Sequence, residues 1–265
     1  MTLDLQRWQP PVPIAHRGSR LLWPENTMLG FQRVYDLGFR HFETDLHLTS
    51  DGVLVCFHDD VVERTTDGTG AVSALTLAEL QALDAGYRHA ESGSYPFRGQ
   101  GIAVPTLEEV LEEFPDVGLV VDMKATGLAE PLAQLVDQLG VGDRLIVGSF
   151  SDERLEVFRE LTSGQVATST GPMAARMWLL SSRVGRGGGG NADALQVPTQ
   201  LRGVRVVDKK LVRAAHDAGL QVHVWTVNDT DEMIRLLDLD VDGLISDRPD
   251  LLKDVLVGRD QWRVS

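Results

Sequence analysis

The sequence is poor in cysteine and in positive charge. Cys56 is the one cysteine in 265 residues, so no intrachain disulfide can form and no oxidising compartment is implied. Lys and Arg number 25 against 39 Asp and Glu, which gives a net charge of −14. Nucleic acids and anionic membranes favour positive surfaces, so neither is expected as a bulk partner. A phosphate-bearing substrate would therefore need local cations at its binding site.

Long apolar runs are also absent. No segment approaches the roughly 18 apolar residues of a membrane span, and residues 1–13 lack the basic and apolar stretches of a signal peptide. We therefore expect a cytoplasmic protein with no integral membrane association. Hydrophobic residues still make up 43% of the chain, enough for a full core, and residues 1–265 suit a single α/β barrel domain.

Strand-length apolar runs alternate with helix-period segments along most of the chain. Such alternation indicates βαβ units with a parallel sheet. We expect strands at 12–15, 40–45, 118–123, 144–148, 165–169, 193–197, 221–226 and 242–246. We expect helices at 27–37, 106–113, 152–161, 209–218 and 229–238. Asn26 can cap the first helix and Gly38 can end it. Eight parallel strands predict a closed TIM-type (β/α)8 barrel, whose strands end at one mouth.

The segment 46–104 interrupts this alternation as a small insertion after the second strand. Its first part is typical of an antiparallel hairpin, because the turn TSDG separates two apolar runs and a parallel crossover needs a dozen or more residues. Folding back about this turn would bring His58 beside Asp45. The remainder is rich in turn formers. We therefore expect a hairpin followed by an irregular insertion over the barrel mouth.

One low-complexity segment, RVGRGGGGN at 183–191, is a flexible connector by its composition. It lacks the lysine and the serine or threonine of a phosphate-binding P-loop, and no clear strand leads into it. We assign it no chemistry.

The strand sequence FETDLH carries three ionisable side chains. Glu43, Asp45 and His47 occupy alternate positions, so a strand directs all three to one face. Burying two such carboxylates without a cation would be costly, and a divalent metal is their natural companion. Asp122, at the end of a neighbouring strand, supplies a third oxygen ligand, and Lys124 points to the same side. His47 is a candidate to position a metal ligand.

Histidines end two of the extended runs. His16 and Arg17 close the first expected strand, and His58 closes the hairpin. Arginine can bind a pair of phosphate oxygens, and imidazole is the side chain best suited to move a proton near neutral pH. Two histidines at the mouth are therefore candidates for an acid and base pair.

Aromatic residues follow two later strands. Trp225 ends the run VHVW, and Phe150 follows LIVGS. Each could pack in the core or form an apolar wall of the substrate pocket, and the sequence leaves both interpretations open. Asp247, in LISDRP, is likewise either a site residue or the cap of the following turn.

These strings occur in an ordered series. The chain contains HRG, PENT, E-T-D-L-x-L-T-x-D-G, V-x-x-H-D, R-T-T-x-G-x-G, P-T-L-E-E-V, D-M-K, S-F, W-T-V-N and G-L-I-S-D-R-P, from about His16 to Pro249. The series resembles the glycerophosphodiester phosphodiesterases over nearly the whole chain. The resemblance implies a β/α barrel hydrolase that uses a divalent cation, Mg²⁺ or Ca²⁺, to split a glycerophosphodiester into glycerol 3-phosphate and an alcohol.

The same resemblance implies roles at matching positions. The implied roles are catalysis by His16 and His58, metal ligation by Glu43 and Asp45, and substrate contacts by Arg17, Lys124, Phe150 and Trp225. Asp122 departs from the pattern, because the family usually has E-x-K where this chain has D-M-K. Aspartate is one methylene shorter than glutamate, so its reach to a metal differs.

Two other functions are compatible with the sequence. A lysophospholipase D-like or sphingomyelinase D-like phosphodiesterase of the same barrel group would need an apolar approach to the mouth. MWLLSS at 177–182 offers apolar surface, although we expect it to pack on the barrel. A non-catalytic barrel could instead retain a phosphorylated ligand, but it has no need of two histidines beside three carboxylates. We therefore expect an enzyme whose partner is a small glycerophosphodiester.

Overall fold

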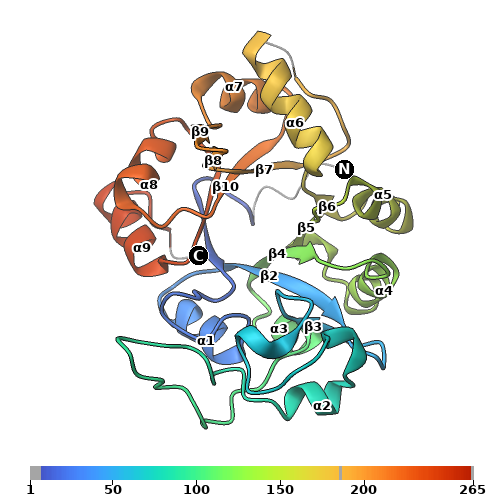
Figure 1. The fold of residues 1–265 in the computed structure, drawn as a ribbon. Helices are drawn as coiled ribbons and strands as arrows, with labels where there is room; N and C mark the ends of the chain where they lie inside the picture. Colours follow the sequence, from blue (N-terminus) through green and yellow to red (C-terminus); the bar gives the residue numbers. More distant parts are fainter. Residues whose placement is uncertain (1–6, 185–186, 264–265) are drawn as a thin grey trace.

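The computed structural model describes residues 7–184 and 187–263, which form a nearly closed β/α barrel (Figure 1). Within these residues, eight parallel strands make the wall: β1 (Val12–His16), β2 (His41–Leu48), β4 (Gly118–Met123), β5 (Leu145–Gly148), β6 (Ala167–Thr168), β7 (Ala194–Pro198), β10 (Gln221–Trp225) and β11 (Gly243–Ser246). Their spatial order is β6-β5-β4-β2-β1-β11-β10-β7, and a parallel bridge between Ser169 and Ala194 joins the two ends. Each strand overlaps an expected one, which confirms the TIM-type barrel.

Helices surround the strands (Figure 1). They are α1 (Met28–Asp36), α3 (Leu107–Glu113), α4 (Ala129–Leu139), α5 (Asp152–Leu161), α6 (Pro172–Ser181), α7 (Lys209–Asp217), α8 (Thr230–Leu237) and α9 (Pro249–Gly258). Shorter elements are η3 (Gly142–Arg144), η4 (Ser182–Val184), β8 (Gln200–Leu201) and β9 (Val204–Arg205), the last two forming an antiparallel pair. None of the helices in the described residues combines the length and the apolar character needed to cross a membrane.

Successive side chains of β2 point alternately into the apolar core and into the pocket inside the barrel. Phe42 and Leu46 are fully buried in the apolar layer between strands and helices. Phe31 of α1 stacks on Phe42 with 5.5 Å between ring centroids, and burying each such side chain contributes roughly 1.5–3 kcal/mol. Glu43 and Asp45, at the alternate positions, line the pocket inside the barrel. One strand therefore supplies both the packing and the polar groups.

Helix α1 begins one residue later than expected, and the prediction that Asn26 caps it was wrong. Thr27 is the cap, and its Oγ1 accepts a hydrogen bond from the backbone N–H of Gly30 at 3.1 Å. Asn26 has a φ of 52°, and its Nδ2 donates to Asp45 Oδ2 at 3.1 Å. Both residue types make good caps, so a contact with a distant carboxylate decided between them.

The insertion after β2 has more regular structure than its turn-rich sequence predicts. Its elements are β3 (Leu54–Cys56), η1 (Val62–Arg64), η2 (Val72–Ala74) and α2 (Leu77–Gln81). β3 pairs antiparallel with β2, with Leu46 opposite Cys56. Thr76 and Glu79 form a capping box at the start of α2, which is the local sequence signal for this helix.

The insertion lies beside the barrel (Figure 1) and has an apolar core of its own. This core consists of Val55, Phe57, Val62, Val72, Leu80, Ala85, Ile102 and Val104. Leu29 of α1 packs against it, which anchors the insertion to the outside of the barrel. The structure describes all of residues 46–104. Of these residues, only His58 lines the pocket inside the barrel. His58 is therefore the residue through which the insertion, expected over the mouth, reaches the pocket.

The glycine-rich segment 183–191 lies partly outside the described residues, which omit 185 and 186. In the described part, Trp178 Nε1 donates to the carbonyl oxygen of Gly189 at 3.2 Å. A Cβ at Gly188 would lie 2.6 Å from the Trp178 ring. Glycine is therefore required there by the close approach of the backbone to an indole.

A neutral histidine lies inside the barrel and predicts acid sensitivity. His223 is fully buried 6.3 Å from the ring of Trp8, and burial lowers its pKa to about 3. Its unfolded pKa is about 6.5, so in the window between these values the unfolded chain binds a proton that the folded chain does not. The stability is fully present above the unfolded pKa and falls by a few kcal/mol as the pH drops through the window.

Urea titrations at neutral pH and at about pH 4 measure this loss, since linear extrapolation gives the free energy of unfolding. His223→Leu should lose less stability between the two pH values than the wild-type chain. An equal loss in both proteins would show that other groups cause the acid sensitivity.

Candidate active site

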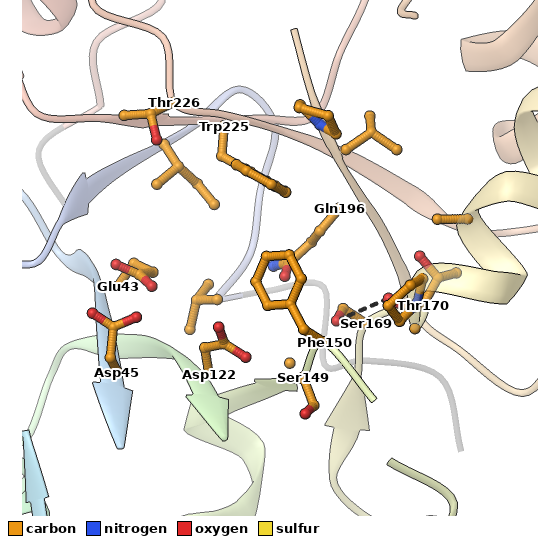
Figure 2. A pocket seen from close by; sticks show the side chains of 18 of the residues that line it. Glu43, Asp45, Asp122, Ser149, Phe150, Ser169, Thr170, Gln196, Trp225 and Thr226 are labelled. Carbon is orange, nitrogen blue, oxygen red and sulfur yellow. Dashed lines mark hydrogen bonds between the residues drawn. The ribbon is translucent and has the colours of Figure 1, made fainter. Parts of the chain in front are cut away.

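One pocket of about 400 Å³ lies at the carboxyl ends of the barrel strands. It is lined by all the predicted site residues, namely His16, Arg17, Glu43, Asp45, His58, Asp122, Lys124, Phe150 and Trp225. Figure 2 shows the carboxylates of Glu43, Asp45 and Asp122 toward one side of this pocket. The barrel thus brings together side chains from distant parts of the sequence.

Three buried carboxylates form one wall of the pocket. Glu43 and Asp45 belong to β2, and Asp122 lies beside Asp45 in the parallel register of β4. Burial and the neighbouring Asp45 raise the pKa of Glu43 to about 7. Burial also raises the pKa of Asp122. Three carboxylates this close together therefore favour either the protonation of a carboxyl group or the binding of a cation at this wall.

Arg17 and Lys124 both pair with Asp45. Arg17 Nε lies 2.9 Å from Asp45 Oδ2, and Lys124 Nζ lies 2.8 Å from Asp45 Oδ1. Lys124 Nζ is also 2.6 Å from Asp122 Oδ2. Burial alone would raise the pKa of Asp45, but the two cations outweigh it and the pKa is lowered. Asp45 is therefore ionised between two positive side chains that face the pocket.

The backbone after β1 explains how Arg17 reaches Asp45. Arg17, Gly18 and Ser19 have φ values of 53°, 66° and 73°, so the chain turns through the left-handed region. At Gly18 a Cβ would lie 2.9 Å from the backbone of Gly30, which only glycine avoids. The turn also lets the Arg17 N–H donate to the carbonyl oxygen of Glu43 at 2.9 Å.

The carboxylate wall has the chemistry of a site for a hard divalent cation. Mg²⁺ and Ca²⁺ prefer carboxylate oxygens, and the buried Oδ1 of Asp122 has no hydrogen-bond partner among the described residues. In the part of the chain that the structure describes, no three His, Cys, Asp or Glu side chains are grouped to hold a metal as they stand. Lys124 Nζ instead bridges Asp45 and Asp122. These oxygens are the donors that such a cation would take, in competition with the Lys124 ammonium.

His16 is oriented by Asp247, whose role the sequence left open. His16 Nδ1 donates to Asp247 Oδ1 at 2.6 Å, while its Nε2 lies 3.6 Å from Glu43 Oε2. Asp247 is fully buried and also accepts from Asn228 Nδ2 at 2.9 Å and Arg20 Nε at 3.1 Å. Burial lowers the pKa of His16, but Glu43 and Asp247 together raise it above its usual value. Asp247 thus contacts His16 and does not cap the helix that follows.

His58 is held by a chain of charges that sequence reasoning missed. Its Nδ1 donates to Asp59 Oδ1 at 2.5 Å, and Arg64 pairs with Asp59. Arg64 Nη2 also lies 2.6 Å from Glu25 Oε1, which accepts from Arg17 Nη1 at 3.2 Å. Burial lowers the pKa of His58. The strings PENT and RTT contain Glu25 and Arg64, so the motif series was the available signal.

His47 supports the hairpin and not the carboxylates. Its Nε2 lies 3.2 Å from the carbonyl oxygen of His58. It is buried behind the pocket and does not line it. His47 therefore helps to fix the backbone that carries His58.

Phe150 and Trp225 form an aromatic wall. Their rings meet at 75° with centroids 5.8 Å apart, and Lys124 Nζ lies 5.3 Å from the Phe150 centroid. Phe150 is 62% exposed, so core packing is not its role. Trp225 also packs on the apolar cluster inside the barrel, which keeps the wall in place.

Cations, carboxylates and imidazoles thus meet at the carboxyl-terminal mouth of a β/α barrel, where enzymes of this fold carry their catalytic groups. The cations suit an anionic substrate, and the imidazoles suit proton transfer near neutral pH. Together, the fold and the pocket define a barrel enzyme for a phosphate ester.

Comparison with known proteins identifies the family. Residues 16–251 match the Glycerophosphoryl diester phosphodiesterase family. The chain is 37% identical over 267 residues to a Mycobacterium tuberculosis protein named Probable glycerophosphodiester phosphodiesterase 2, with 98% of this chain and 96% of that protein covered. The chain belongs to the glycerophosphoryl diester phosphodiesterase family, and it is an enzyme rather than a non-catalytic binding barrel.

Solved structures agree with this family. A glycerophosphodiester phosphodiesterase from Agrobacterium tumefaciens superposes with a TM-score of 0.75 at 27% identity, covering 91% of this chain and 98% of that chain. A phosphodiesterase from Oleispira antarctica, in complex with the product sn-glycerol-3-phosphate, superposes with a TM-score of 0.74 at 27% identity, covering 94% of this chain and 97% of that chain.

Proposed function

We propose that this enzyme hydrolyses glycerophosphodiesters to glycerol 3-phosphate and an alcohol, with the aid of Mg²⁺ or Ca²⁺. The observation that carries the proposal is the convergence of two cations, three carboxylates and two histidines on one pocket of about 400 Å³. Such a volume suits a small diester. The product complex of the Oleispira antarctica relative supports the same substrate class.

The two histidines share the proton transfers in this proposal. Each imidazole donates a hydrogen bond from its Nδ1–H to a carboxylate, His16 to Asp247 and His58 to Asp59, which leaves Nε2 as the reacting nitrogen. One histidine takes a proton from the oxygen that attacks phosphorus. The other gives a proton to the alkoxide that leaves as the P–O bond breaks. Arg17 stabilises the charge that builds up on the phosphoryl oxygens.

Glu43, Asp45 and Asp122 would hold the divalent cation. When bound, the cation supplies Lewis-acid stabilisation of a phosphoryl oxygen. Lys124 would have to leave the carboxylates, since its Nζ lies 2.8 Å from Asp45 and 2.6 Å from Asp122. We infer that Lys124 then turns to the substrate phosphate, so that one positive charge replaces another at the carboxylate wall.

Release of glycerol 3-phosphate tests this function. We expect release from glycerophosphocholine and glycerophosphoethanolamine to stop after chelation and to return with Mg²⁺ or Ca²⁺, because the proposed reaction depends on Lewis-acid stabilisation of a phosphoryl oxygen. A coupled glycerol 3-phosphate assay measures the rate with each ion. Full activity after exhaustive chelation would contradict the role of the metal but not the reaction.

Apolar side chains of the pocket and of helix α6 favour a second candidate, a lysophospholipase D-like activity. Leu179 and Leu201 line the pocket, and Met177 and Leu180 are 54% and 67% exposed. The segment 177–182 was expected to pack on the barrel, and its Trp178 is buried in this way. An acyl chain could cover the exposed side chains. Release of choline from micellar lysophosphatidylcholine, but not from glycerophosphocholine, would establish this candidate instead.

A further inference from the structure

Polar side chains line an end of the pocket that the proposed reaction does not use. Ser169 and Thr170 follow β6, and Gln196 lies on β7. Ser169 and Thr170 are buried, with 2% and 6% of their surface exposed. Figure 2 shows these two residues across the pocket from Glu43 and Asp45. They are therefore remote from the groups assigned to phosphate and metal.

Two polar atoms at this end lack a partner. Within the described residues, the buried Nε2 of Gln196 and Oγ1 of Thr170 make no hydrogen bond. The hydrogen bond from Ser169 Oγ to the carbonyl oxygen of Thr170 is 3.5 Å long and therefore weak. Buried polar groups in folded proteins are nearly always satisfied. These atoms are thus available to a polar ligand.

A glycine makes room beside them. A Cβ at Gly148, at the end of β5, would lie 3.3 Å from Ser169 Oγ and 3.4 Å from Gln196 Oε1. The polar atoms of Ser169 and Gln196 therefore both approach the open side of Gly148. Any larger residue at this position would fill the hollow between them.

The chemistry of these groups matches hydroxyls. Among the described residues that line the pocket, the acidic ones are Glu43, Asp45 and Asp122, so a cationic group would find no counter-ion near Gln196. A hydroxyl accepts from an amide N–H and donates to an amide oxygen, and a second hydroxyl can bond to Thr170 in either sense. An apolar group would leave the same atoms unpaired.

We propose that Ser169, Thr170 and Gln196 form a subsite that binds hydroxyl groups of the substrate. The hydroxyls belong either to the glycerol of the diester or to a polyol headgroup, because both present a diol beside a phosphate. The inference rests on the proposed function, since it places a phosphodiester in this pocket, and it adds the residues that select a hydroxylated substituent.

Binding of sn-glycerol 3-phosphate, measured by calorimetry, tests the subsite without any turnover. Gln196→Met keeps the length of the side chain and removes its amide, so we expect the Kd to rise about tenfold. Inorganic phosphate has no diol, and its Kd should stay unchanged. Gln200→Met is the matched control, because Gln200 is exposed on β8 and does not line the pocket. Thr170→Val provides a second, isosteric variant.

Kinetics then identify the source of the hydroxyls. Glycerophosphocholine carries them on its glycerol alone, whereas glycerophosphoglycerol carries them on both sides. A raised KM of Gln196→Met for both substrates assigns the subsite to the glycerol, and a raised KM for glycerophosphoglycerol alone assigns it to the headgroup. If no diester is turned over but glycerol 3-phosphate binding is weakened, the subsite stands and the proposed function fails. Unchanged glycerol 3-phosphate binding in both Gln196→Met and Thr170→Val, together with an unchanged KM of both variants for glycerophosphoglycerol, would overturn the subsite.

Discussion

Replacing His16 or His58 with alanine is expected to lower kcat for glycerophosphocholine by about 100-fold or more, the usual contribution of a general acid or base. The reason is geometric. Both rings line the same pocket, and each has its Nδ1 fixed by a carboxylate, so each presents Nε2 for proton transfer. Steady-state rates of glycerol 3-phosphate release measure the loss, and circular dichroism checks that each variant is folded.

His89→Ala is the matched control for these variants. His89 lies in the insertion, where it contacts Phe97, and it does not line the pocket. We expect its kcat to stay within about twofold of the wild-type value, as is usual for substitutions away from special sites. Near-normal turnover in both His16→Ala and His58→Ala would remove the proposed proton transfers.

Replacing Asp247 with asparagine is expected to lower kcat by about 100-fold, because the proton transfer through His16 depends on it. Asp247 Oδ1 accepts from His16 Nδ1 at 2.6 Å and therefore keeps the proton on that nitrogen. An asparagine has no charge, and its amide can present N–H to the ring instead of oxygen. The variant would thus leave His16 in place but with the wrong nitrogen protonated. Asp247 acts through His16, so it is a positioning residue.

The pH profile of Asp247→Asn separates this role from a structural one. Asp247 helps to raise the pKa of His16, so removing its charge should lower that pKa and move one limb of the kcat/KM profile to lower pH. Movement of the acidic limb would make His16 the base, and movement of the basic limb would make it the acid.

A neighbouring substitution supplies the control for Asp247. Asp250→Asn makes the same chemical change in the first turn of α9, where Asp250 pairs with Arg248 at 2.6 Å outside the pocket. We expect its rate and its pH profile to match those of the wild-type enzyme. A slow Asp247→Asn enzyme with an unshifted profile would mean that Asp247 stabilises the fold and does not tune His16.

The sequence predicted the barrel because its strands and helices depend on local patterns. The apolar runs of β4 and β5 lie close to their expected bounds, and the expected helix at 152–161 is α5. Alternation along β2 correctly separated Phe42 from Glu43 and Asp45. Strand ends also located the site, since parallel strands of a barrel end at one mouth.

The same patterns failed where the contact partner is distant. Asn26 and Thr27 are both good caps, and the hydrogen bond from Asn26 to Asp45 determined which of them caps α1. The apolar core of the insertion packs against Leu29 of α1, a contact that the turn-rich sequence of the insertion does not predict. A turn-rich sequence indicates little about the surface on which its few apolar residues will bury.

The sequence by itself determined which residue types reach the mouth of the barrel, since strand periodicity and strand ends are properties of short segments. Tertiary structure alone decided how those residues pair. His16 meets Asp247 across 231 positions of the chain, and Lys124 bridges Asp45 and Asp122 on adjacent strands. Hydrogen bonds and ion pairs act over about 3 Å. They are therefore set by the closure and register of the barrel, which short segments do not encode.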